Sequence, residues 1–199
     1  MLFRSKLEPL IQGKDCLVLA IPRGGVIVGD EIARNLGLPL DVVIAKKITP
    51  PDYPEYAIGS VTFDGVLFYG KNWSRYSEDS GFQEEIDKKK AEVRRQIQEY
   101  RGHTNYALQG KTILLVDDGI ATGATVSVIL KWLEKKNTES IILVTPLIPF
   151  TTHEIIKRFG IKIISLEIPM TFSSVGQFYR KFDQIPDKIV LNILQKYRN

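Results

Sequence analysis

The sequence predicts an α/β fold in which a central parallel sheet is flanked by helices. Five short runs are continuously apolar rather than alternating, which is typical of strands that helices cover on both faces. These runs are 17–21, 41–45, 112–116, 141–145 and 162–166. Helical patterns separate them at 26–36, 125–136 and 151–159, with glycine stop signals at 37 and 160. This alternation predicts parallel strands joined by right-handed helical crossovers.

Two segments depart from the alternation, within a chain whose 199 residues fit one domain. Residues 48–110 form a large predicted insertion, with a β-hairpin about Asp64-Gly65 followed by a long amphipathic helix. Residues 169–185, here named the hood segment, are rich in loop-forming residues, and a helix is expected to start near Pro186. We therefore expect a single domain, 1–199, that carries an insertion and a hood.

Composition and charge exclude several classes of protein. The net charge is +4, but the basic residues of 88–101 are interleaved with acids, which favours a solvated helix face over a nucleic-acid surface. Cys16 is the single cysteine, so no internal disulfide or thiolate zinc cluster can form. No run reaches the roughly 18 apolar residues of a membrane span, and the N-terminus lacks a signal-peptide core. We expect a soluble, cytoplasmic protein.

A loop after the third apolar run has the composition of a phosphorylated-sugar site. Two acids, Asp117 and Asp118, follow the strand, and a helix opens within the small and hydroxylated run Ala121-Thr122-Gly123-Ala124-Thr125. Free N–H groups at a helix N-terminus bind phosphate. The acids repel phosphate, so their partners are sugar hydroxyls or a Mg²⁺ ion that bridges hydroxyls and pyrophosphate. The alternative, an ordinary loop with an acidic helix cap, needs only one aspartate.

Residues 116–125 resemble the motif with which type I phosphoribosyltransferases bind 5-phosphoribosyl 1-pyrophosphate (PRPP). The shared features are two acids, a short apolar spacer and a threonine- and glycine-rich loop. The resemblance implies that Asp117 and Asp118 contact the ribose 2′- and 3′-hydroxyls. It also implies that residues 121–125 hold the 5-phosphate.

A second loop resembles the pyrophosphate loop of the same family. Pro22-Arg23-Gly24-Gly25 follows the first strand; its glycines allow close backbone approach to pyrophosphate, and Arg23 can bind phosphate oxygens as a fork. In the family this loop often holds a non-proline cis peptide, which corresponds here to Pro22–Arg23.

Basic residues after the second strand could also meet the pyrophosphate. Lys46 and Lys47 follow the run 41–45, and related enzymes place a lysine or arginine at the corresponding strand end, which faces the ligand crevice. One of the two is expected to contact pyrophosphate, with a slight preference for Lys47.

The resemblance extends over nearly the whole chain, to a subgroup of predicted phosphoribosyltransferases whose acceptor the sequence does not name. The motifs that carry it are 20–26, 39–41, 55–59, 100–102 and 175–182. It implies Mg²⁺-dependent transfer of the phosphoribosyl group to a nitrogen of a small acceptor, with Asp117, Asp118 and Arg23 as the catalytic residues. Ala121 stands where 6-oxopurine enzymes carry an acid, which disfavours such acceptors.

The hood segment is expected to choose the acceptor, because the chain leaving the last strand passes over the ligand edge of the sheet. Its aromatic residues Phe172, Phe178 and Tyr179 suit stacking on a flat molecule, although they could equally cap the core. A homodimer is compatible with the resemblance. The alternative function is a non-catalytic protein that senses PRPP.

Overall fold

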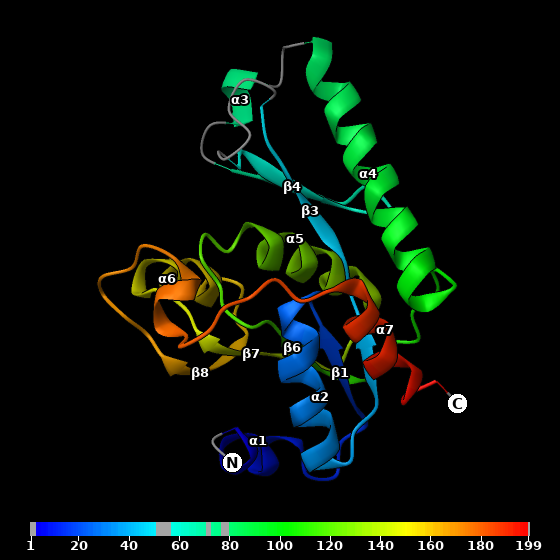
Figure 1. Ribbon diagram of the computed structural model, residues 1–199, viewed down its shortest axis with the longest axis vertical. Coiled ribbons are helices and arrows are strands. Elements are labelled where there is room, and N and C mark those ends of the chain that lie inside the picture. The colour runs from blue at the N-terminus through cyan, green and yellow to red at the C-terminus, as the bar shows by residue number, and fades with distance from the viewer. Residues whose placement is uncertain (1–2, 51–56, 71–72, 77–79, 199) are drawn as a thin grey trace. The chain divides into compact units, whose positions relative to one another are not determined.

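The computed structural model describes residues 3–50, 57–70, 73–76 and 80–198 (Figure 1). Residues 55 and 56, part of one quoted motif, lie outside these ranges. The chain divides into two compact units. The first comprises Met1–Val43, Ala107–Thr122 and Asn137–Asn199, and the second comprises Ile44–Tyr106 and Gly123–Lys136. The expected single domain with an insertion stays a prediction.

The first unit is built on a five-stranded parallel sheet in the order β2-β1-β6-β7-β8. The strands are β1 Cys16–Ala20, β2 Leu40–Val42, β6 Thr112–Val116, β7 Ser140–Leu147 and β8 Lys162–Glu167. Every residue of β1 and β6 is buried, which explains why these runs are apolar except for Thr112. The predicted parallel sheet is confirmed.

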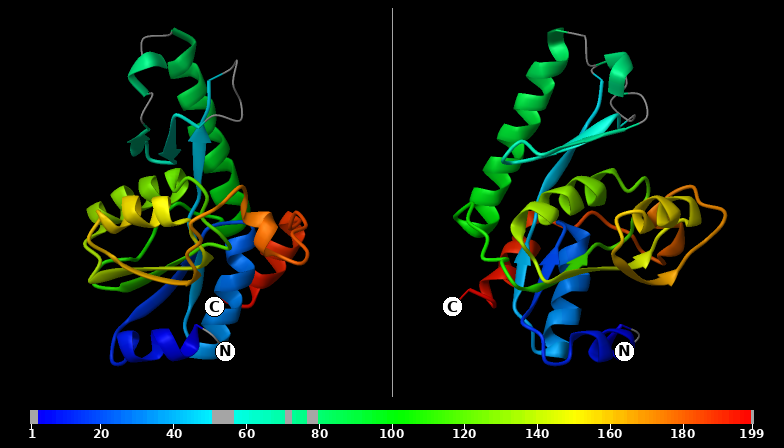
Figure 2. Two further views of the ribbon diagram at one scale, coloured as in Figure 1. Left: turned by 90° about the vertical axis from the view of Figure 1, so that its left-hand side faces the viewer. Right: turned by 180° about the vertical axis from the view of Figure 1, so that it is seen from behind.

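Helices cover this sheet. They are α1 Arg4–Ile11, α2 Gly24–Leu36, α6 Phe150–Lys157 and α7 Asp187–Gln195, with a short 3₁₀ turn, η2, at Val175–Phe178. Helices α2 and α7 lie side by side, and α6 lies on the opposite face of the sheet (Figures 1 and 2). Gly37 is the C-cap of helix α2, and its left-handed φ of 65° lets its N–H donate to Ala33 O. Pro186 is the N-cap of α7, as the sequence predicts.

The second unit contains a three-stranded antiparallel sheet in the order β3-β4-β5. Its strands are β3 Ala45–Ile48, β4 Gly59–Thr62 and β5 Leu67–Tyr69, and its helices are α3 Trp73–Tyr76, α4 Ser80–Arg101 and α5 Ala124–Leu133, the last continued by η1 Glu134–Lys136. The predicted hairpin and long helix are both present. Gly65 turns the hairpin with φ 89°.

The strand expected at 41–45 is wrong in its extent. Strand β2 stops at Val42, and a separate strand, β3, begins at Ala45 and pairs antiparallel with β4. Because Val42, Val43 and Ile44 are all apolar and buried, the run of apolar residues hides the point where the chain leaves one sheet for another. Lys46 and Lys47 therefore lie inside an antiparallel strand, not at the end of a parallel one.

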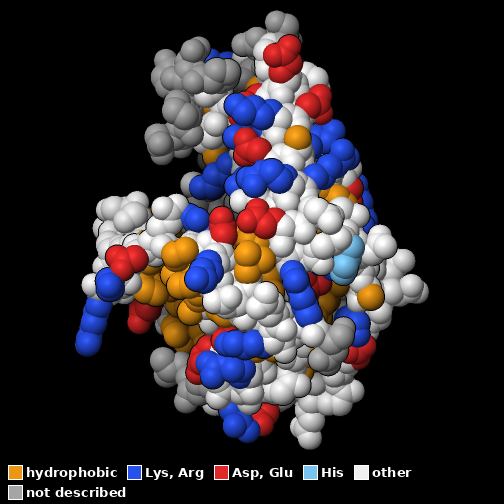
Figure 3. Space-filling view, turned by 45° about the vertical axis from the view of Figure 1, so that its right-hand side comes forward, with side chains coloured by type: hydrophobic (Ala, Val, Ile, Leu, Met, Phe, Trp, Pro, Cys, Tyr) orange, Lys and Arg blue, Asp and Glu red, His pale blue; other side chains and the backbone are white. Residues whose placement is uncertain are grey.

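The charged stretch of α4 is a solvated face with paired charges. Lys89 Nζ lies 3.3 Å from Glu85 Oε1, and Arg95 Nη1 lies 3.4 Å from Glu99 Oε2. On the face of the molecule shown in Figure 3, Lys and Arg side chains are interspersed with those of Asp and Glu. The charges of α4 thus stabilise the helix locally and do not form a uniformly basic surface.

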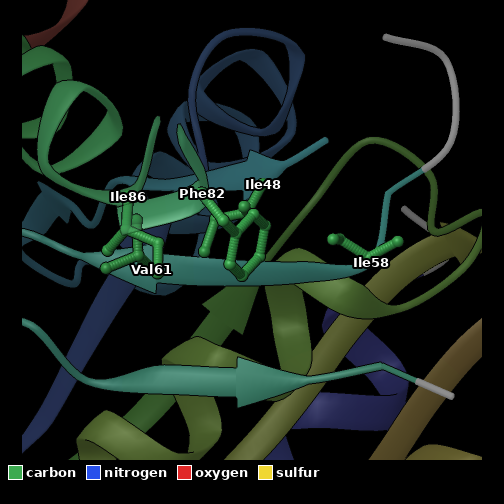
Figure 4. Packing of buried hydrophobic residues seen from close by; sticks show 5 residues of the cluster. All are labelled: Ile48, Ile58, Val61, Phe82 and Ile86. Carbon is green, nitrogen blue, oxygen red and sulfur yellow. The ribbon is translucent and has the colours of Figure 1, made fainter. Parts of the chain in front are cut away.

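The core of the second unit lies between α4 and the antiparallel sheet. Phe82 and Ile86 of α4 pack with Ile48, Ile58 and Val61, all of which are buried (Figure 4). Trp132 of α5 donates a hydrogen bond from its indole nitrogen to Asp64 Oδ2 at 2.9 Å.

Among the described residues, no helix is long and apolar enough to cross a membrane.

Candidate functional site

Asp117 and Asp118 lie at the carboxyl end of β6, in the middle of the parallel sheet. Both are half-buried. The backbone N–H of Asp118 donates to Asp117 Oδ1 at 3.0 Å, so the first carboxylate is tied to the loop backbone. Burial raises the pKa of the Asp118 carboxyl, and hydrogen bonds from its surroundings only partly oppose this rise. The loop thus holds a partly desolvated acid whose charge is best satisfied by a hydrogen-bond donor or a cation.

The glycine loop of β1 lies directly against this acid pair. A Cβ atom added to Gly24 would be 1.7 Å from Asp118 Oδ2, and one added to Gly25 would be 2.9 Å from Val116 O. Only glycine permits this approach. The Pro22–Arg23 peptide between β1 and these glycines is cis, as the resemblance implied. The two loops predicted separately from the sequence therefore meet.

Strand register explains why they meet. Strands β1 and β6 are parallel neighbours, and Ala20, the last residue of β1, is level with Val116, the last residue of β6. The segments that follow β1 and β6 therefore leave the sheet at the same level and at the same edge. Loops at the carboxyl ends of adjacent parallel strands form the usual ligand crevice of an open α/β sheet.

Arg23 occupies the N-cap position of α2 at this edge. Its guanidinium lies 3.8 Å from Asp187 Oδ1, in the first turn of α7, and about a third of its side chain is exposed. A separation of 3.8 Å with partial exposure makes this a weak ion pair. Arg23 can therefore exchange Asp187 for a more highly charged anion. Sequence analysis did not single out Asp187, although its place in the first turn after Pro186 was a usable signal.

The residues after the acids connect the loop to neighbouring elements of the first unit. The N–H of Ile120 donates to Leu147 O at 2.9 Å, and Thr152 Oγ1 donates to Ala121 O at 2.6 Å. Thr122 is exposed. The backbone of 120–121 is thus fixed, while the hydroxyl of Thr122 remains accessible to a ligand.

The same loop continues directly into α5. Gly123 has φ 75°, a left-handed conformation that favours glycine, and its carbonyl accepts the N–H of Ser127 at 2.8 Å. Helix α5 begins at Ala124, so the N–H groups of Ala124 and Thr125 belong to a first turn that has no intrahelical acceptors. This is the local geometry that phosphate binding at a helix N-terminus requires.

The lysines of the expected pyrophosphate site belong to the second unit. Lys46 pairs with Val61 and Lys47 with Ser60 across β3 and β4. Lys46 is half-buried and Lys47 is exposed.

The hood segment packs onto the acid loop. The Tyr179 hydroxyl donates to the backbone oxygen of Asp118 at 2.5 Å, and a Cβ on Gly119 would be 2.4 Å from Val175 Cγ1. Burial, together with the negative charges of Asp118 and Asp117, raises the pKa of Tyr179 to about 12. The phenol therefore stays protonated and continues to donate this bond at any physiological pH.

A cavity of about 290 Å³ lies between α2 and the hood, next to the acid pair. Its lining includes Gly24, Asp118 and Tyr179, together with Ile27 and Phe182. We name it the acid-edge cavity. Of the aromatic residues predicted for the acceptor, Tyr179 lines this cavity, and Phe178 and Phe172 stack on each other with ring centroids 6.1 Å apart. Sequence analysis missed the contribution of Ile27.

The acid pair is chemically suited to a magnesium ion but cannot form a complete coordination shell alone. Carboxylate oxygens are preferred Mg²⁺ ligands, and the ion normally keeps waters or phosphate oxygens as its other ligands. Among the residues that the structure describes, no group of three or more His, Cys, Asp or Glu could hold a metal. A magnesium ion here would therefore take its remaining ligands from water or from a phosphorylated ligand.

Comparison with known proteins agrees with the fold. The family model of the phosphoribosyl transferase domain matches residues 2–158. The chain is 33% identical over 192 residues to a Mycobacterium tuberculosis protein named "Putative phosphoribosyl transferase Rv0571c", covering 94% of this chain and 43% of that protein. It thus spans less than half the length of this curated relative.

Two solved structures share the fold of this chain. The protein TT1426 of Thermus thermophilus is 32% identical, with a TM-score of 0.82 over 100% of this chain and 95% of that one. Adenine phosphoribosyltransferase of Saccharomyces cerevisiae, at 14% identity and a TM-score of 0.50 over 83% of this chain and 75% of that one, shares the fold. With the family model matching most of its length, the chain belongs to the phosphoribosyl transferase domain family.

Proposed function

We propose that this protein binds PRPP and transfers its 5-phosphoribosyl group to a nitrogen of a small acceptor, releasing pyrophosphate. The observation that carries the proposal is the contact between Gly24 and the carboxylate of Asp118. It joins a loop suited to pyrophosphate to an acid pair suited to ribose hydroxyls. PRPP carries these two groups on neighbouring carbons of one sugar.

Each part of PRPP then has a counterpart in the chain. Asp117 and Asp118 accept hydrogen bonds from the ribose 2′- and 3′-hydroxyls, and the loop 121–125 binds the 5-phosphate. Arg23 and the backbone of Gly24 and Gly25 bind the pyrophosphate, with one of the two lysines of β3 as a further cation. This assignment rests on residue chemistry and on the family's motif.

In the chemical step the protein must position the acceptor and PRPP and stabilise the charges that develop on the ribose and on the pyrophosphate. The acceptor nitrogen forms a bond to C1 while the C1–O bond to pyrophosphate breaks, and the pyrophosphate leaves with that electron pair. Carboxylates near the ribose stabilise the positive charge that develops on the ring, and Arg23 stabilises the negative charge on the leaving group. Bound magnesium would supply further neutralisation of the pyrophosphate, held by its oxygens and by Asp117 or Asp118. No covalent intermediate with the protein is required.

The hood is proposed to select the acceptor, because Tyr179 and Phe182 line the acid-edge cavity beside Asp118. Ala121 provides no carboxylate for a purine N7, so a 6-oxopurine is disfavoured. The homodimer and the cytoplasmic location expected from the sequence stay predictions.

The test is calorimetric titration with PRPP, with and without Mg²⁺, followed by pyrophosphate release with a panel of bases and amines. We expect micromolar binding that strengthens with Mg²⁺ and is lost when Asp117→Asn and Asp118→Asn are combined, while the folded structure persists by circular dichroism. Unchanged binding in the double variant would refute the site. Tight PRPP binding without release for any acceptor would favour the sensing function instead.

A further inference from the structure

A second and larger cavity adjoins the acid-edge cavity. It has a volume of about 540 Å³ and lies between α2, the ends of β7 and β8, and the hood. Ile27, Val28 and Tyr179 line both cavities. The two cavities are therefore neighbours, separated by the side chains of these three residues, and a ligand that occupied both would have to pass them. We name this second space the apolar cavity.

The walls of the apolar cavity are almost entirely hydrocarbon. Besides the shared residues they include Phe3, Ile32, Leu147, Leu166 and Phe178. Such a surface offers almost no hydrogen bonds, so a ligand with several polar edges would lose its bonds to water without replacement. A volume of this size suits a small organic molecule.

Two acidic residues that line the apolar cavity determine which ligand charge it favours. The carboxylate of Glu31 is paired with Arg34 and is therefore largely neutralised. Among the described residues, no hydrogen bond or ion pair engages the carboxylate of Glu167, which also lines this cavity. An anionic group would be repelled there, so a ligand whose body is uncharged or cationic is favoured.

We infer that the acceptor is a nitrogen nucleophile that carries a bulky apolar body, with its nitrogen in the acid-edge cavity and its body in the apolar cavity. This inference rests on the proposed function. The nitrogen lone pair forms the C1–N bond, the C1–O bond breaks, and pyrophosphate departs with its electron pair. The proton of the nitrogen passes to water. A polar nucleobase would fill the acid-edge cavity and leave the apolar cavity unused.

A matched pair of probes separates the effect of the apolar body from that of the nucleophilic nitrogen. Imidazole and 4-phenylimidazole present the same ring nitrogen and differ by one phenyl group. With PRPP and Mg²⁺, we expect kcat/KM for pyrophosphate release to be at least tenfold higher for 4-phenylimidazole. Adenine, hypoxanthine and orotate serve as polar comparison acceptors and should be weaker than 4-phenylimidazole.

Two phenylalanine variants test the location. Phe178 lines the apolar cavity and is 41% exposed, whereas Phe150, on α6, lines neither cavity and is 43% exposed. Phe178→Ala should remove most of the preference for the phenyl-bearing probe. Phe150→Ala should retain it. The affinity for PRPP should stay within about threefold in both variants, about 0.7 kcal/mol by conversion.

The outcomes separate this inference from the proposed function. If PRPP binds but the polar bases are the better acceptors, or if both phenylalanine variants behave alike, the inference is overturned and the proposed function stands. If PRPP does not bind, the proposed function fails. The cavity is then tested alone by calorimetric titration of 4-phenylimidazole, where saturable binding lost only in Phe178→Ala supports it and equal loss or no binding overturns it.

Discussion

Replacing Gly24 with alanine tests the contact on which the site depends. The added Cβ would lie 1.7 Å from Asp118 Oδ2 and 2.4 Å from Asp118 Cγ. Ordinary contacts begin near 3.4 Å, so the carboxylate oxygen must move by about 1.7 Å, the difference between these two distances. Rotation of the aspartate side chain can absorb that movement. The backbone can stay in place because Gly24 has helical geometry in the first turn of α2.

The size of the effect follows from what Asp118 is proposed to do. A misplacement of about 1 Å in a positioning group can reduce activity by about 100-fold. Loss of one hydrogen bond to a charged group weakens binding by roughly 1.5–3 kcal/mol, or about 10- to 150-fold. We therefore expect Gly24→Ala to raise the Kd for PRPP by about 10- to 100-fold. The free energy of unfolding should change by less than about 1 kcal/mol, because alanine is also the better helix former.

The adjacent glycine provides a contrast. A Cβ on Gly25 would be 2.9 Å from Val116 O and 3.0 Å from Asp117 Cα, both backbone atoms of β6 and its loop. Backbone cannot rotate away, so Gly25→Ala should lower the unfolding midpoint in urea as well as weaken binding. Gly24→Ala should weaken binding alone.

A double-mutant cycle shows whether Gly24→Ala acts through Asp118. In an Asp118→Ala background the nearest remaining contact is the Cβ of residue 118 at 3.0 Å, so the second change should weaken PRPP binding by less than about threefold. Calorimetry measures the four Kd values, and circular dichroism monitors the fold. Full additivity of the two changes, or unaltered binding in Gly24→Ala, would refute the proposed role of this contact.

Three further predictions concern Asp118, Tyr179 of the hood, and the core of the second unit. Burial raises the pKa of the Asp118 carboxyl above its value in the unfolded chain, so the folded protein loses stability as pH rises through that pKa and the buried carboxyl ionises. Asp118→Asn should therefore unfold at a higher temperature than the parent at pH 7.5. Calorimetric scans should show this difference in unfolding temperature shrinking toward pH 4. Tyr179→Phe should raise the KM for the acceptor more than the Kd for PRPP and destabilise the protein by about 0.5–1.5 kcal/mol, whereas an unchanged KM would count against the hood as the acceptor site. Phe82→Ala should reduce the free energy of unfolding by about 3–5 kcal/mol in urea titrations, and a loss below about 1 kcal/mol would contradict the packing of Figure 4.

Much of the parallel sheet was predictable because burial on both faces leaves a simple signature. The runs at 17–21 and 112–116 match β1 and β6 to within one residue, since burial there favours apolar side chains at nearly every position. The acid pair was equally visible, because two adjacent carboxylates at a strand end have no role in a core. Local chemistry thus identified both loops of the candidate site.

The change of sheet near residue 43 could not be predicted in the same way. Val42, Val43 and Ile44 are all buried, and their composition does not report that β2 ends and β3 pairs with a different sheet. Burial determines which residues are apolar, whereas the partner strand is determined by distant residues such as those of β4. The place of Lys46 and Lys47 depended on this distinction, and the prediction for their strand failed with it.

The cavities likewise depend on pairing between strands that are far apart in the sequence, which is why the apolar cavity had no signature in the sequence. Ile27 and Val28 belong to helix α2, Leu166 lies in strand β8, and Phe178 is the last residue of the 3₁₀ turn η2. Each is explained locally as core or surface. Only the strand order β2-β1-β6-β7-β8 brings the start of α2 to the same edge as the segment that follows β8. In this arrangement Tyr179 of the hood packs on Asp118, and Phe178 lines the apolar cavity. The surface proposed to select the acceptor is therefore hydrogen-bonded to the backbone of the loop proposed to bind PRPP.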